Sequence, residues 1–179
     1  MVFGFGRQRY ERIGFTLYAA AVAAARHPAL YRDLGVPDTL DGRFDLVGLY
    51  AALLILRLEA EPPLGHALAQ AIFDAMFSDM DVNLREMGVG DLSVGKRVKA
   101  MWTAFNGRAA AYAAALAESD PAPLEAALAR NIWRGNPPAT LAAAMARLVR
   151  SEQQNLASQK MAELAAGAVH FLVPSPAHA

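Results

Sequence analysis

The chain has 179 residues, enough for one domain with a sizeable core, and its 17 basic side chains balance 17 acidic ones. This balance argues against broad nucleic-acid binding, although it allows a local basic patch. The sequence contains no cysteine, which excludes disulfides, thiolate catalysis and cysteine-ligated metals.

The start of the chain, MVFGFGRQRYERIGF, is too polar for a secretory signal and is interpreted as mature sequence. We treat residues 1–8 as an N-terminal extension. The longest apolar run, Leu46 to Leu56, ends at Arg57 and is well short of the roughly 20 residues that a membrane helix needs. We therefore expect a cytoplasmic protein, most naturally from a bacterium.

Apolar residues at helical spacing, without hairpin signals or repeats, predict an all-α fold. We expect a single compact domain of about six helices. The first is predicted from about Arg9 to Arg26. It stops before Pro28, because a proline disfavours helical geometry in the residue that precedes it. A turn at 29–34 follows. The second helix, about Arg43 to Glu59, is apolar nearly all round, which predicts the buried centre of the fold.

The third and fourth helices flank a corner that contains Gly88 and Gly90. The third helix carries apolar residues at helical spacing: Leu64, Leu68, Ile72, Met76, Met80, Leu84 and Met87. The fourth has a similar stripe: Val94, Val98, Met101, Trp102, Phe105, Tyr112 and Leu116. Glycine favours the left-handed cap of the third helix, and Asp91 or Ser93 can cap the fourth. The stretch is therefore predicted to be an αα-hairpin.

The same corner contains a partial match to a phosphate-binding loop. Residues 90–96 fit the pattern G-x-x-x-x-G-K, which must be followed by a magnesium-binding Ser or Thr. This chain has Arg97 there, and a helix instead of a strand is predicted before Gly88. We therefore predict no nucleotide binding at the corner.

Prolines mark the remaining helices. Pro121 begins a fifth helix, which ends near Gly135, and a proline pair at 137–138 opens a sixth. Beyond Arg150 the sixth helix turns polar, which indicates that this half leaves the core or contacts another element. The helical domain is expected to cover 9–166. The C-terminal tail, 167–179, is too short to fold alone and is expected to fray.

No catalytic or metal-binding motif emerges. The histidines are scattered: His27, His66, His170 and His178. None has a second histidine at ligand spacing, and no Glu-x-x-His occurs. The acidic run before the corner is better explained by a solvated helix face, with Asp81 four residues before Arg85 as in a surface ion pair. We expect no enzyme activity, metal or cofactor.

Charged side chains gather around the glycine corner. A solvated surface is the default interpretation, and a docking surface for a protein partner is the sharper hypothesis. The candidate partner-binding residues are Asp79, Asp81, Arg85, Glu86, Lys96, Arg97, Lys99 and Arg108. Gly107 costs a helix interior about 1 kcal/mol relative to alanine, which predicts that another element packs closely there.

Two stretches together carry a family pattern. The first is LGVPDTLDGRFD at 34–45, and the second runs from Phe77 to Gly95. The pattern continues with Lys96, Arg97, Lys99, Phe105, Gly107, Arg108 and Tyr112. Over roughly residues 10–150, the chain resembles the ubiquinol–cytochrome c chaperone family, the assembly factors for the cytochrome bc1 complex.

This resemblance implies a helical, non-enzymatic chaperone that binds newly made cytochrome b or another bc1 subunit. The chain looks like a bacterial member with the core domain alone, whereas mitochondrial members work with a small partner at the ribosome. The alternative is a lipid- or small-ligand-binding helical protein at the membrane surface. For the chaperone, Phe3 and Phe5 beside Arg7, Arg9 and Arg12 are candidates for a weak peripheral contact with the cytoplasmic face of the inner membrane; the competing interpretation is an N-terminus without a binding role.

Overall fold

The computed structural model describes residues 3–138 and 140–174, which contain helices and no strands. The described helices are α1 (Phe3–Ala25), α2 (Pro28–Arg32), α3 (Leu40–Glu59), α4 (Leu64–Glu86), α5 (Asp91–Ala117), α6 (Ala122–Ile132), α7 (Leu141–Ser158) and α8 (Met161–Leu164). The all-α prediction is confirmed. Two short helices add to the expected six: α2 lies in the predicted turn, and α8 follows α7.

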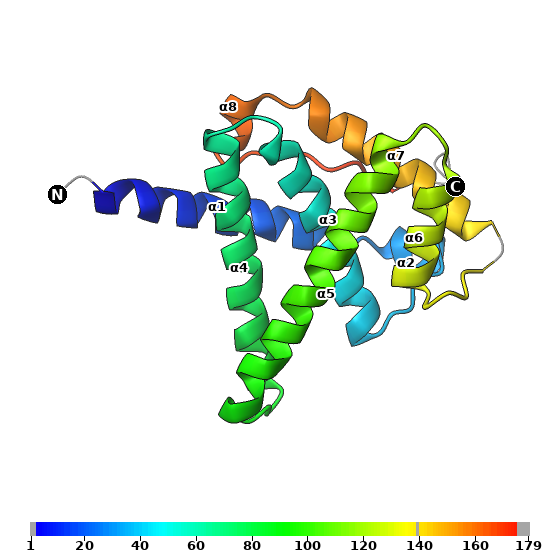
Figure 1. Cartoon of the computed structure of the whole chain (residues 1–179), viewed down its shortest axis with the longest axis horizontal. Coiled ribbons are helices and arrows are strands. Elements are labelled where there is room, and N and C mark those ends of the chain that lie inside the picture. Colours follow the sequence, from blue (N-terminus) through cyan, green and yellow to red (C-terminus); the bar gives the residue numbers. More distant parts are fainter. Residues whose placement is uncertain (1–2, 139, 175–179) are drawn as a thin grey trace.

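α3 lies at the centre of the fold, as its apolar sequence predicted (Figure 1). It contacts α1, α4, α5, α6 and α7. Leucines such as Leu46, Leu54 and Leu58 are fully buried along it, and each stabilises the fold by roughly 1.5–3 kcal/mol. The helix begins at Leu40, before the predicted Arg43, because the side chain of Thr39 accepts the Gly42 N–H at 3.1 Å and caps it.

α1 crosses α4 and α3, and its N-terminal part extends away from the body of the molecule (Figure 1). Gly14 makes the crossing with α4 close, because a Cβ at this position would lie 2.6 Å from the backbone carbonyl of Ala71. The helix begins at Phe3, earlier than the predicted Arg9. No described helix is both long and apolar enough to span a bilayer.

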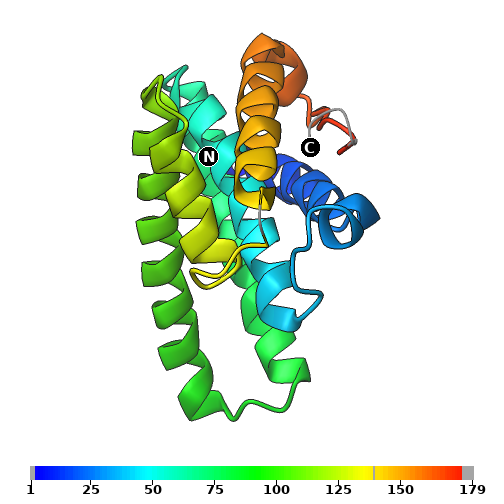
Figure 2. The ribbon, with the colours of Figure 1, turned by 90° about the vertical axis from the view of Figure 1, so that its right-hand side faces the viewer.

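α4 and α5 form the predicted hairpin, and its closed end projects well beyond the other helices (Figures 1 and 2). Gly88 has a φ of 79°, the left-handed geometry that glycine adopts without strain. The N–H of Val89 reaches back to the Leu84 carbonyl at 3.0 Å and closes the end of α4. A helix therefore precedes the partial phosphate-loop pattern, as the sequence indicated.

The polar half of α7 binds the C-terminal segment. The carboxylate of Glu152, 1% exposed, accepts the Leu172 N–H at 2.9 Å. The Gln159 amide accepts the His170 N–H at 2.9 Å and donates to the His170 carbonyl at 2.6 Å. Phe171 meets the Tyr50 ring edge-on, with centroids 5.5 Å apart.

The expectation of a frayed tail is therefore wrong for residues 168–174, and 175–179 lie outside the described residues. Polar side chains of α7 satisfy the backbone of an extended segment, and the sequence alone does not reveal this pairing. The division into an extension, a domain and a tail stays a prediction.

Candidate functional site

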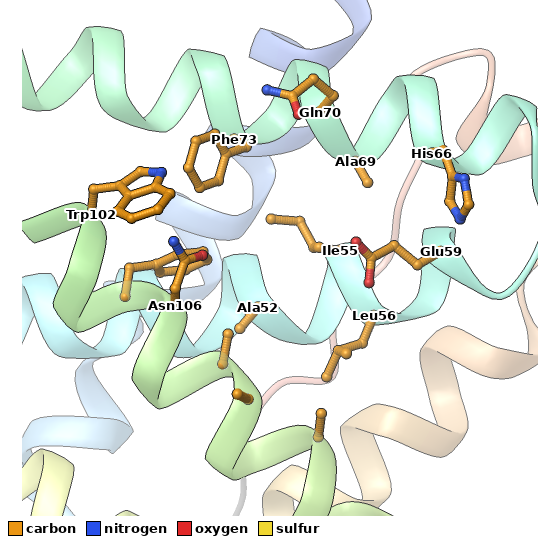
Figure 3. Close-up of a pocket in the computed structure, with 14 residues that line it drawn as sticks. Ala52, Ile55, Leu56, Glu59, His66, Ala69, Gln70, Phe73, Trp102 and Asn106 are labelled. Carbon is orange, nitrogen blue, oxygen red and sulfur yellow. The ribbon is translucent and has the colours of Figure 1, made fainter.

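An open groove of about 810 Å³ lies between α3, α4 and α5 (Figure 3). α4 and α5 meet at the hairpin end and diverge away from it, so that α3 forms the floor between them (Figure 1). The floor residues are Ala52, Ile55, Leu56 and Glu59. The α4 wall consists of His66, Ala69, Gln70 and Phe73. The α5 wall consists of Trp102, Phe105, Asn106, Ala109, Ala110 and Ala113.

Aromatic side chains form the end of the groove nearer the hairpin turn. The Phe73 and Phe77 ring centroids lie 4.6 Å apart, and Phe105 meets these rings at 6.0 and 6.2 Å. Trp102 remains 46% exposed although it is a large apolar residue, and it borders the same space as Phe73 (Figure 3). Exposed tryptophan beside a packed aromatic cluster is typical of residues that contribute strongly to protein binding.

Small side chains line the rest of the α5 wall. Ala109, Ala110 and Ala113 leave the backbone of α5 accessible, and Ala69 faces the groove from α4. Surfaces of small residues allow another helix to approach closely. Glu59 is the single carboxylate among the lining residues, which include no lysine or arginine. Apart from Glu59 on the floor, the groove therefore offers no carboxylate, lysine or arginine that an uncharged, apolar helix would bury.

Four of the eight sequence-predicted site residues make contacts within the chain. Asp79 accepts a hydrogen bond from the Tyr18 hydroxyl at 2.8 Å, and burial, together with this contact, raises the pKa of Tyr18. Arg85 pairs with Asp81 at 2.6 Å, as predicted, and also with Asp91. Arg108, the fourth residue, turns toward α3.

The other four predicted residues are exposed: Glu86, Lys96, Arg97 and Lys99. Among the described residues, no ion pair involves any of them. Whether any of the eight binds a partner stays a prediction. Gly107 has no atom within 4 Å of the place where a Cβ would lie, so the expected close neighbour is not found among the described residues.

Asp45 is a buried acid that sequence analysis did not single out. It is 3% exposed and lies between Arg108, at 3.0 Å, and Arg134, at 2.8 Å. The Arg108 guanidinium also lies over the Phe44 ring, 5.6 Å from its centroid. Burial raises the pKa of the Asp45 carboxyl above its ordinary value, while the two arginines oppose this shift. We call this group, Phe44, Asp45, Arg108 and Arg134, the Asp45 cluster.

The family-like stretch at 34–45 supports the Asp45 cluster. A Cβ at Gly42 would lie 2.1 Å from the Pro37 carbonyl oxygen, so only glycine fits this approach. The Trp133 indole N–H donates to the Gly35 carbonyl at 3.0 Å, and this bond joins the stretch to the end of α6. The stretch and the Asp45 cluster therefore join α3, α5 and the segment after α6. Their role is to stabilise the fold. The family pattern at 34–45 contains Asp45, but the pattern alone does not show which of its carboxylates is buried.

In the described part of the chain, no three histidine or carboxylate side chains gather closely enough to hold a metal ion.

Comparisons with known proteins agree on one family. The family model described as ubiquinol-cytochrome C chaperone matches residues 32–171. The crystal structure of the Cbp3 homolog from Brucella abortus is similar, with 36% sequence identity and a TM-score of 0.83. The alignment covers 96% of this chain and 97% of that one. No curated protein matches the chain.

Proposed function

The chain belongs to the ubiquinol–cytochrome c chaperone family, and on this premise we propose that it binds newly made cytochrome b and supports assembly of the cytochrome bc1 complex. Family membership supports the coarser role, that of an assembly chaperone for this complex. The groove between α3, α4 and α5 is the observation that supports the finer one. The proposal assigns binding to the protein, and no catalytic step.

A membrane subunit needs protection before assembly because each of its helices exposes about 20 predominantly apolar residues. The groove offers an apolar floor and an alanine-rich wall to such a helix. Each Å² of apolar surface removed from water contributes roughly 25 cal/mol. Part of this gain is offset by the cost of association, which favours reversible holding over permanent binding. Gln70 and Asn106 supply hydrogen-bonding groups at the two walls.

We retain the charged corner as a second part of the proposal. Asp79, Asp81, Arg85 and Arg108 would act indirectly, because they hold α4 and α5 in place. The exposed side chains would act directly: Glu86, Lys96, Arg97 and Lys99. We place the protein at the cytoplasmic face of the inner membrane, where a membrane subunit is inserted.

Filling the groove tests this function. Ala110 is exposed and lines the groove, so Ala110→Trp should leave the fold intact while blocking a helix from the α5 wall. Ala104→Trp is the matched control, because Ala104 is exposed on the same helix but does not line the groove. We expect cytochrome b recovered with the tagged chaperone, from cells that make the bc1 complex, to fall roughly tenfold or more for the groove variant only.

Circular dichroism would check that both variants are folded. Normal recovery of cytochrome b with folded Ala110→Trp would exclude the groove as the site. No recovery with the wild-type chain would contradict cytochrome b binding itself. The alternative function, lipid or small-ligand binding, predicts instead that the purified protein fills its groove without any protein partner.

A further inference from the structure

The closed end of the α4–α5 hairpin carries exposed apolar side chains. The large exposed apolar residues of the described chain are Phe15, Leu40, Val82, Met87, Leu92, Trp102 and Val173. Val82, Met87 and Leu92 all belong to this one end, with exposed fractions of 49%, 51% and 100%. We call residues 81–99 the hairpin tip. Such a concentration of exposed apolar residues marks an interaction site more often than single surface leucines do.

The described chain leaves open space around the glycines of the hairpin tip. No atom lies within 4 Å of the Cβ positions of Gly88, Gly90 and Gly95. Figures 1 and 2 show the tip reaching beyond every neighbouring helix, so that a flat surface can contact it without meeting the rest of the molecule first.

Basic side chains lie just behind the apolar ones. Leu92, Lys96 and Lys99 share the outer face of α5, because positions four and seven apart lie on one side of a helix. Residues 81–99 contain four basic and three acidic side chains, a net charge of +1. Two of the acids, Asp81 and Asp91, are paired with Arg85. This group keeps one negative charge and Glu86 adds another, whereas the basic side chains of α5, Lys96, Arg97 and Lys99, carry three positive charges without an ion pair among the described residues.

We propose that the hairpin tip rests on an anionic membrane surface, with Met87 and Leu92 in the interfacial layer and Lys96 and Lys99 among the lipid phosphates. The helical rise places these lysines about 6 Å and 10 Å behind Leu92, which matches the depth of roughly 5–10 Å that interfacial helices reach. Lysine stems lie along apolar surface while their ammonium groups remain in water. This contact goes beyond the proposed function and needs no bc1 subunit.

Flotation of the purified full chain with lipid vesicles tests the contact. We expect binding to vesicles of equal parts phosphatidylcholine and phosphatidylglycerol, little binding to pure phosphatidylcholine, and loss of binding at high salt. Lys96→Glu with Lys99→Glu, and separately Leu92→Asp, should each lower the bound fraction about tenfold. Arg130→Glu with Arg147→Glu is the matched control, because it makes the same charge change at exposed positions of α6 and α7.

A fluorescent label adds a second readout that does not depend on charge reversal. The chain has no cysteine, so Leu92→Cys can carry an environment-sensitive dye at a single place. Its emission should shift to the blue with anionic vesicles. The same dye at Val173→Cys, which is 67% exposed on the C-terminal segment, should not respond.

Three results would overturn the inference. One is failure of the wild-type chain to float with anionic vesicles. A second is equal loss of binding in the α6–α7 control, because attraction would then follow net charge alone. A third is vesicle binding at the wild-type level by both tip variants, because the tip residues would then not make the membrane contact. Since the vesicles contain no bc1 subunit, these results are independent of the groove experiment.

Discussion

The Asp45 cluster and the hairpin tip both contain charged residues of the family pattern, yet the fold uses them in opposite ways. Arg108 turns inward to a carboxylate that is 3% exposed, whereas Lys96 and Lys99, on the same helix, point to solvent. α5 therefore carries one cation that pairs with the core and, nearer its N-terminal end, cations that remain exposed. A charge in a sequence pattern thus says little about its role until its partner, or its lack of one within the chain, is known.

Removing the inward-turned acid should have the largest effect. Asp45→Ala leaves Arg108 and Arg134 without their buried partner, which we expect to lower the free energy of unfolding by about 3 kcal/mol. Urea unfolding would measure the loss. Asp41→Ala is the control, because Asp41 is 84% exposed and its distance of 4.0 Å from Arg134 is long for an ion pair. A loss no larger than the control's would show that the cluster does not hold the fold.

Glu152 is a second inward-turned acid, and its contribution to stability should depend on pH. Glu152 accepts hydrogen bonds from Asn155 and from the Leu172 N–H, so Glu152→Gln should lower the free energy of unfolding by about 1–2 kcal/mol. Burial raises the pKa of Glu152 above its ordinary value. The folded state therefore holds the Glu152 proton more tightly than the unfolded state does.

Glu152 therefore makes its whole contribution to stability below the pKa that it has in the unfolded state. This contribution declines as pH rises through the pKa that it has in the folded state. The wild-type advantage over Glu152→Gln should therefore shrink over the pH range that begins near the ordinary glutamate pKa of about 4.3 and extends upward. Unfolding curves of both proteins across this range would show it. An advantage that grows with pH would mean that the accepted hydrogen bonds outweigh burial and that the pKa of Glu152 is lowered.

The smallest effect on stability is expected at the exposed N-terminal end of α5. Lys96→Glu with Arg97→Glu should leave unfolding close to that of the wild type, because exposed charges contribute little. Cytochrome b capture in cells should nevertheless fall, since docking and membrane contact at the tip both depend on positive charge. Normal cytochrome b accumulation with this folded variant would show that the basic side of α5 is not needed for docking or for membrane contact.

Much of the fold was predictable because its causes are local. Apolar spacing located the long helices, the continuous apolar run around Leu49 identified α3 as central, and glycine at the corner predicted the hairpin. The order of the tail at 168–174 was missed because it depends on Glu152 and Gln159, which are distant in sequence.

The site was harder to predict than the fold. The stripe that contains Trp102 and Phe105 looked like ordinary core, and only the divergence of α4 from α5 leaves Trp102 in an open groove. Likewise, Arg108 looked like a surface charge until Asp45 was found beside it. Periodicity shows which residues share a helix face, but it does not show whether another element covers that face.

Site-specific photocrosslinking in cells that make the bc1 complex would show directly whether the groove holds cytochrome b. A photoreactive residue would replace Trp102 or Asn106 in the groove and, as a control, Ala126 on the exposed side of α6. We predict crosslinks to newly made cytochrome b from both groove positions and none from Ala126. Crosslinks from Ala126 alone, or from no position while the chaperone still co-purifies with cytochrome b, would contradict the account.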